Sequence, residues 1–119
     1  VYYADLNWKE LMKAIRSVKV SYKEISKFPA VKRDLALLLD KKVQFAEIEK
    51  IAYETEKKLL KEVSLFDVYE GKNLEAGKKS YAVSFLLQDE SQTLNDKMID
   101  KIMSKLVKNL EDKLGAKLR

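Results

Sequence analysis

Two runs rich in aromatic and β-branched residues flank a short polar loop bracketed by glycines. The runs are Leu65–Gly71 and Gly77–Phe85. Such a pair of runs predicts a β-hairpin, in which side chains two residues apart share a face of the sheet. A chain with this feature is expected to contain an antiparallel sheet, and alternation predicts which side chains lie together.

One face of the predicted hairpin carries a ring among small polar groups. Alternation places Tyr69 opposite Ser80 and Asp67 opposite Ala82. The other face is apolar and holds Phe66, Val68, Tyr81, Val83 and Phe85. An unstacked RNA base stacks on a tyrosine ring while its edge meets a carboxylate or hydroxyl. The first face therefore suits single-stranded RNA. The commoner explanation of a tyrosine in a strand is structural: tyrosine favours strands, and its hydroxyl contacts water.

The remaining periodicities add two helices and two strands. The expected elements are a strand at Val31–Asp40, a helix at 44–60, hairpin strands near 62–70 and 79–87, a helix after Thr93 and a strand at Ala116–Arg119. This order predicts an α+β, ferredoxin-like βαββαβ fold, with two helices on one face of a four-stranded antiparallel sheet. The other face is expected to be open and to carry Asp34, Ala36, Asp67, Tyr69, Ser80, Ala82 and Ser84.

Helix boundaries and the amino-terminal segment can also be predicted. Thr93 and Asp96 have the spacing of a capping box, and Gly115 is expected to end the second helix in a left-handed conformation. Residues 1–27 suggest a short strand and a short helix without a core of their own. Within them, Trp8 and Tyr22 are expected to be packing residues.

Composition excludes most catalytic chemistry. The chain has no cysteine and no histidine, so it lacks thiolate nucleophiles, imidazole bases, disulfides and the usual zinc ligands. The remaining carboxylates, lysines and hydroxyls do not assemble into a catalytic spacing, so we expect neither a catalytic residue nor a metal site. No apolar run approaches the length of a membrane span, and the missing cysteines fit a cytoplasmic origin.

The net charge of +5 favours contact with a polyanion. Almost all the excess is lysine, because Arg16, Arg33 and Arg119 are the only arginines. Lysine suits general electrostatic attraction to phosphates better than bidentate hydrogen bonding to bases. The alternative is that these lysines simply form a solvated surface. Arg33 is expected to pair with a carboxylate.

Five segments, taken in their order and spacing, indicate a particular protein family, which periodicity alone does not. They are Phe28–Ala36, Leu65–Gly71, Gly77–Ser80, Thr93–Asp96 and Gly115–Arg119. Together they closely resemble the ferredoxin-fold anticodon-binding domain at the carboxyl end of the bacterial phenylalanyl-tRNA synthetase beta subunit. The resemblance covers residues 28–119. Residues 1–27 then look like the tail of the preceding catalytic-like domain.

The resemblance implies a function for the chain. The parent would be a cytoplasmic class II aminoacyl-tRNA synthetase with two alpha and two beta subunits, which joins phenylalanine to its tRNA with ATP and magnesium. The chemical steps would belong to the alpha subunit, so this part would be non-catalytic and would hold no cofactor. Its partner would be the anticodon of tRNA(Phe), and no membrane contact is implied.

The resemblance also implies site residues. The aromatic residue that matches Tyr69 stacks on the first anticodon base, and the residues that match Asp67 and Ser80 give polar contacts nearby. Lysines around the hairpin loop, namely Lys72, Lys78 and Lys79, are expected to hold phosphates. A strand carboxylate paired with a neighbouring lysine is the structural alternative for Asp67.

Two other functions fit a ferredoxin-like fold. Small-molecule regulatory domains and acylphosphatase-type enzymes need a glycine-rich or arginine-bearing loop after the first strand, and residues 40–44 contain neither glycine nor arginine. A non-catalytic domain-docking role predicts apolar residues on the open face, where the expected residues are mostly small and polar.

Overall fold

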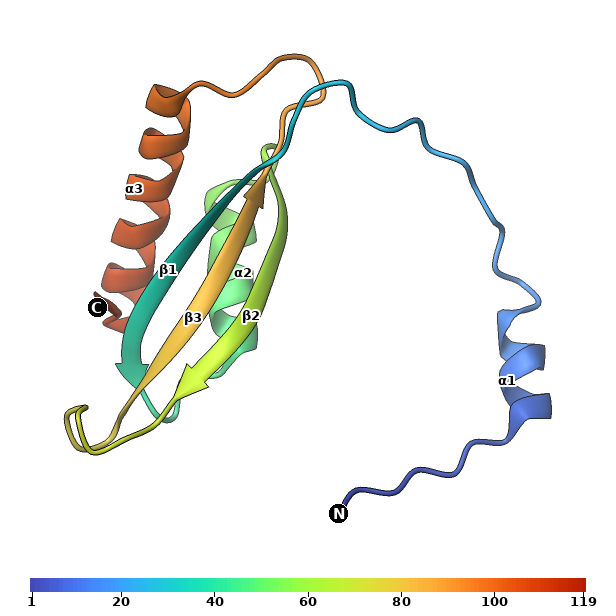
Figure 1. Cartoon of the computed structure of the whole chain (residues 1–119), viewed down its shortest axis with the longest axis horizontal. Helices are drawn as coiled ribbons and strands as arrows, with labels where there is room; N and C mark the ends of the chain where they lie inside the picture. The colour runs from blue at the N-terminus through green and yellow to red at the C-terminus, as the bar shows by residue number, and fades with distance from the viewer.

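The structure is a computed structural model that describes all 119 residues. The elements are α1 (Trp8–Ile15), β1 (Val31–Asp40), α2 (Phe45–Thr55), β2 (Leu60–Tyr69), β3 (Lys78–Leu87), α3 (Asp96–Leu114) and β4 (Lys117–Leu118). The strands form one antiparallel sheet in the order β2-β3-β1-β4. From β1 onwards the chain has the expected βαββαβ order (Figure 1).

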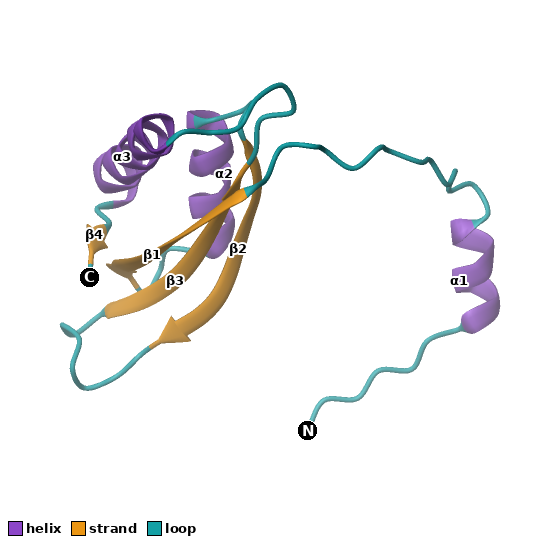
Figure 2. Cartoon of the chain, turned by 45° about the horizontal axis from the view of Figure 1, so that its top comes forward, coloured by secondary structure: helices purple, strands orange, loops and turns teal.

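Helices α2 and α3 lie side by side on one face of this sheet (Figure 2). This is a ferredoxin-like α+β arrangement, as the periodicities predicted. The face that α2 and α3 leave uncovered is called the open face below. None of the helices is long and apolar enough to cross a membrane.

The core lies between the sheet and the two helices. On β1 the leucines at positions 35, 37 and 39 face the helices, as alternation predicts, and the last two are fully buried. The largest fully buried side chains are Phe85, Leu37, Leu39, Ile48, Leu87, Ile99, Leu106 and Leu110. Burial of this apolar surface is the main force that holds the helices on the sheet.

The ends of α3 show where local prediction succeeds. Gly115 ends the helix with a positive φ of 63°, as expected for a left-handed cap. The predicted N-cap at Thr93 is wrong, because the side chain of Asn95 accepts the hydrogen bond from the Met98 N–H at 2.9 Å. Asparagine is among the best N-cap residues, and it lies directly before the first helical residue.

A β-bulge in β2 corrects the predicted faces of the hairpin. The pairing with β3 runs from Leu65↔Val83 to Asp67↔Ala82, so Phe66 is an extra residue without its own partner. Two residues of a bulged strand then oppose one residue of the partner strand. Phe66 was predicted to face the helices, but it is 59% exposed and its ring lies near Lys32 on the open face.

Residues 1–22 make no hydrogen bond or ion pair with the domain and are all exposed, which corrects two predictions. No strand forms at the amino terminus, and Trp8 and Tyr22 are exposed. Helix α1 forms as expected, capped by Asn7, but none of its residues is buried. Its apolar side chains are Trp8, Leu11, Met12 and Ile15, and all are exposed.

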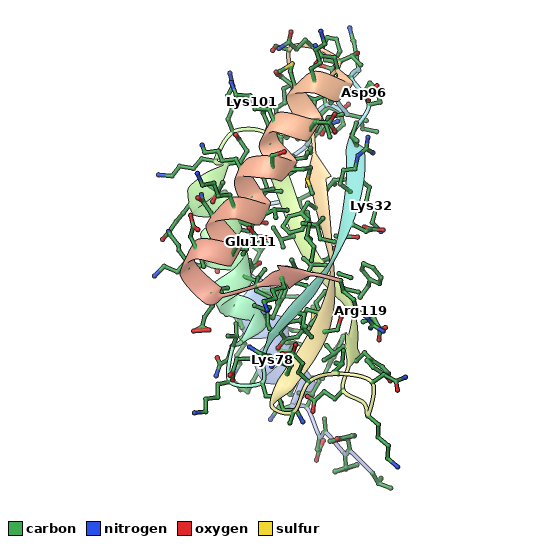
Figure 3. The ribbon with its side chains drawn as sticks, turned by 90° about the vertical axis from the view of Figure 1, so that its left-hand side faces the viewer. Lys32, Lys78, Asp96, Lys101, Glu111 and Arg119 are labelled. Carbon is green, nitrogen blue, oxygen red and sulfur yellow. The ribbon has the colours of Figure 1, made fainter.

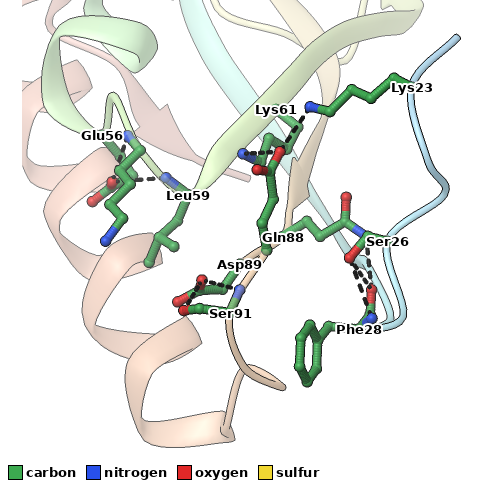
Figure 4. Close-up of polar contacts among 11 residues, drawn as sticks. Lys23, Ser26, Phe28, Glu56, Leu59, Lys61, Gln88, Asp89 and Ser91 are labelled. Atoms are coloured by element: carbon green, nitrogen blue, oxygen red, sulfur yellow. Dashed lines mark hydrogen bonds and ion pairs between the residues drawn. The ribbon is translucent and has the colours of Figure 1, made fainter.

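The amino-terminal segment is joined to the domain by polar contacts near the end of β3 (Figure 4). The Gln88 side-chain amide donates to the Phe28 carbonyl at 2.7 Å, and the ammonium of Lys23 lies 2.9 Å from a Glu90 carboxylate oxygen. Hydrogen bonding and the charge of Lys23 lower the pKa of Glu90. Next to it, the hydroxyl and backbone N–H of Ser91 donate to the Asp89 carboxylate and lower its pKa.

Candidate nucleic-acid interface

Strand register places all seven predicted residues on the open face. Directly opposed residues of antiparallel strands share a face. The rows across β2, β3 and β1 are Ser64–Ser84–Asp34, Asp67–Ala82–Ala36 and Tyr69–Ser80–Leu38. The bulge at Phe66 is what brings Asp67 and Tyr69 to this face, because without it their side chains would continue the alternation from Leu65 and face the helices.

Tyr69 lies at the end of β2, and the residue is 38% exposed. The guanidinium carbon of Arg119 lies 5.3 Å from the ring centroid, within the range of a cation–π contact. The Arg119 backbone N–H donates to the Ala36 carbonyl at 3.0 Å, which extends the β4–β1 ladder by one step. Between Arg119 and β2 in the register lie Ala36 and Ala82, which have small side chains.

Arg119 therefore belongs to the same surface as Tyr69. In Figure 3 the chain turns from α3 past the edge of the sheet, and Arg119 lies on the side away from that helix. Sequence reasoning missed this residue, although arginine is scarce in the chain. The available signal was its place two residues after Lys117, which in the ferredoxin-like strand order puts it beside β1.

Gly71 fixes how the Tyr69 ring lies. A Cβ atom at Gly71 would lie 2.5 Å from the ring carbon Cζ and closer still to the phenol oxygen. The φ of Gly71 is not positive, so the backbone itself would accept alanine. Glycine lets the Tyr69 ring lean along the strand over this position.

Gly71→Ala is expected to move the Tyr69 ring while leaving the fold intact, because only the ring stands in the way of the new methyl group. Nuclear Overhauser contacts between the ring and Arg119 should weaken, and the ring proton shifts of Tyr69 should change. The melting temperature should stay within a few degrees of that of the unaltered chain, because the substitution changes no core residue. An unchanged set of ring contacts in the variant would contradict the glycine's role.

Asp67 and Ser80 flank the ring in different states of exposure. The Asp67 side chain is exposed and takes part in none of the ion pairs of the chain, so the alternative of a lysine partner is not realised. An ionised carboxylate accepts hydrogen bonds only, so it suits amino and imino donors. Ser80 is on the open face but only 5% exposed, under its neighbours in the row.

The three predicted loop lysines separate in the structure. Lys72 is exposed in the loop, and Lys78 is half-buried opposite Asp40 on the open face. Lys79 is opposite Leu39, on the helix face, and is only 9% exposed. Its ammonium lies 4.5 Å from the ring centroid of Tyr81. The structure therefore does not bring Lys79 to the open face, because one step along a strand reverses the side chain.

The hairpin loop is held by its own hydrogen bonds. The Leu74 N–H donates to the Gly71 carbonyl at 3.1 Å, and the Lys78 N–H donates to the Glu75 carbonyl at 3.0 Å. An ion pair of 3.2 Å joins Lys41 to Glu70. The ion pairs of the chain include none of Lys72, Lys78 and Arg119, which all lie at this end of the sheet.

Arg33 does not form the expected carboxylate pair. Its guanidinium donates to the Lys32 carbonyl at 3.1 Å, and Arg33 takes part in none of the ion pairs. By register it lies opposite Phe85 on the helix side, at the exposed start of β1. The Arg33 side chain is exposed to solvent at this end of β1.

The open face combines charged, polar and aromatic side chains at one end. No three acidic side chains come close enough to hold a metal ion. The groups at the end of the hairpin are an aromatic ring, a guanidinium, an exposed carboxylate and the hydroxyl of the buried Ser80. They offer a stacking surface, a positive charge and hydrogen-bond acceptors side by side.

The βαββαβ order, with both helices on one face of the sheet, makes this a ferredoxin-like domain. Its polar and aromatic surface lies on the sheet face that the helices leave uncovered. The sequence profile of the family described as "Ferredoxin-fold anticodon binding domain" matches residues 26–119, and the chain belongs to that family.

The chain is also similar along its length to curated proteins named phenylalanine–tRNA ligase beta subunit. It is 94% identical over 119 residues to the one from Bacteroides thetaiotaomicron and 60% identical over 119 residues to the one from Porphyromonas gingivalis. Identity to the Bacillus subtilis protein is 42% over 118 residues. The chain spans 14% of the length of the first two relatives and 15% of the third.

Proposed function

We propose that the chain is the anticodon-binding module of a phenylalanine–tRNA ligase beta subunit and that its open face receives the anticodon of tRNA(Phe). The observation that carries the proposal is the grouping of Tyr69, Asp67 and Arg119 on one uncovered sheet face. Family membership and the names of the similar proteins support the same function. The module is taken as residues 28–119, with residues 1–27 as the tail of the preceding domain.

Tyr69 supplies the stacking surface in this proposal. An anticodon base that no longer stacks on the adjacent bases can stack on the phenol ring instead. Arg119 already lies near that ring, so it can stack on the base or hold its phosphate. Asp67 accepts hydrogen bonds from amino or imino groups on the base edge, and the Ser80 hydroxyl becomes reachable if the ring shifts to meet the base.

Phosphate contacts follow from the distribution of cations. Arg119 lies beside the ring, and Lys78 lies on the same face opposite Asp40. Lys72 is exposed in the hairpin loop. Lys79 is left out, because its ammonium lies over Tyr81 on the helix face. Neutralisation of phosphates by these cations releases counterions and makes binding depend on salt.

The chemical steps are proposed to lie elsewhere in the parent enzyme. The curated relatives are ligases, and the chain covers a small part of each. We place the joining of phenylalanine to tRNA, with its ATP and magnesium, on the alpha subunit of a cytoplasmic class II synthetase. The role of this module is to position the tRNA.

Titration of the 119-residue chain with the tRNA(Phe) anticodon stem-loop tests the proposal. The loop should bind more tightly than the same stem closed by a loop without the anticodon, because only the former presents the bases. The logarithm of the binding constant should fall against the logarithm of salt with a slope of about −1.5 to −2, as expected for two or three neutralised phosphates on a single strand. Equal binding of the two loops, or no binding up to millimolar RNA, would reject the proposal.

A further inference from the structure

A second exposed ring stands on the open face. The side chain of Phe66 is 59% exposed, because the bulge between Leu65 and Asp67 leaves it unpaired and turns it away from the helices. Bulges commonly re-aim a side chain next to a functional site. The bulge therefore leaves a large apolar ring on the uncovered face, where a ligand can reach it.

The groups around Phe66 are polar. Lys32 places its ammonium 5.9 Å from the ring centroid, at the outer limit of a cation–π contact. Asp34 lies one row further along β1 and accepts a hydrogen bond from the Ser84 hydroxyl. The core of a protein–protein contact is depleted of charged residues, so a lone ring among charges and hydroxyls fits a planar polar ligand better than an apolar partner.

Resting on the function proposed above, we propose that Phe66 is a second stacking platform on the open face, which receives another unstacked base of the same RNA loop. Lys32, freed from the ring by the incoming base, contacts the adjoining phosphate. Asp34 and Asp67 keep acceptor oxygens available for the edge of the base. The open face then holds two nucleotides.

The spacing of the two rings fits separate bases. Tyr69 and Phe66 are three residues apart on β2, which at roughly 3.3 Å per residue separates their Cα atoms by about 10 Å. Stacked bases follow each other at about 3.4 Å along a strand. Two bases that remain stacked on each other therefore cannot occupy both rings, and the loop must present them splayed apart.

Abasic stem-loops combined with ring variants test this proposal. The 119-residue chain is titrated by fluorescence anisotropy with the intact anticodon stem-loop and with three versions that each lack one anticodon base. Phe66→Ala should weaken binding of the intact loop about fivefold or more, as loss of one stacked base predicts. That loss should disappear for one abasic loop, and the loss caused by Tyr69→Ala should disappear for a different one.

Val68→Ala is the matched control, because Val68 is an exposed apolar residue of the same strand that pairs with Tyr81 on the other face. It should leave the affinity unchanged. Lys32→Gln should make the salt slope shallower by about 0.7, the value for one phosphate contact on a single strand.

The outcomes separate this inference from the proposed function. Weaker binding by Tyr69→Ala with full affinity in Phe66→Ala would overturn the second platform and leave the anticodon function standing, with protein docking as the remaining use of Phe66. Loss of both effects at the same abasic position would also overturn it, because one base would then serve both rings. Absence of any binding by the unaltered chain would reject both proposals together.

Discussion

Replacement of Tyr69 by alanine is expected to weaken binding of the tRNA(Phe) anticodon stem-loop about 5- to 150-fold. The expected loss corresponds to roughly 1–3 kcal/mol, the contribution of one base stacked on an aromatic side chain. Tyr69 is 38% exposed and its ring lies beside Arg119 and Gly71, so removal of the ring takes away little buried surface. Affinity measured at one fixed salt concentration gives the comparison, because electrostatic attraction changes with salt.

Tyr69→Phe is the control for this experiment. It keeps the stacking surface and removes only the phenol oxygen, which lies over Gly71. Binding close to that of the unaltered chain is therefore expected. If Tyr69→Ala folds normally and binds with undiminished affinity, Tyr69 is not the platform, and the open face must be read differently.

Phe85→Ala is expected to destabilise the domain by about 3–5 kcal/mol, as found when a large buried ring is truncated. Phe85 is fully buried on β3 between Val63 of β2 and Arg33 of β1 in the register, beneath the two helices. Domains of this size are stable by only about 5–15 kcal/mol, so the variant should lose roughly a fifth or more of its stability. Chemical denaturation followed by circular dichroism measures the loss.

Phe66→Ala provides the comparison, since it removes the same side chain from the neighbouring strand at an exposed position. Its free energy of unfolding should change by less than about 1 kcal/mol, as is usual for exposed sites. Similar losses in the two variants would mean that the core does not lie where the burial pattern places it. The same measurement establishes that Phe66→Ala folds before its RNA binding is tested.

The sequence predicted more of the site than periodicity usually allows. Tyr69 is opposite Ser80, and Asp67 is opposite Ala82. Both pairs were predicted by counting residues outwards from the hairpin loop. The prediction worked because a hairpin is local, so the turn alone sets the register over the last few pairs. It stopped working at Phe66, because a bulge depends on how the partner strand pairs and leaves no mark in the alternation.

Lys79 and Arg119 illustrate the second limit. Proximity to the loop put Lys79 among the phosphate contacts, but its position opposite Leu39 turns it to the helix face. Arg119 is distant from Tyr69 in sequence, and only the placement of β4 next to β1 carries it across the sheet. Which lysine or arginine reaches a site depends on long-range strand order.

The order of strands and helices, the buried leucines of β1 and the left-handed cap at Gly115 were determined by the sequence alone. These features depend on local backbone preferences and on a period of two or 3.6 residues, which each segment carries within itself. Tertiary structure decided the bulge, the exposure of Phe66, the burial of Ser80 and the contact between Arg119 and Tyr69. Each of these arises where segments distant in the chain meet, so it depends on packing between elements that no single segment encodes.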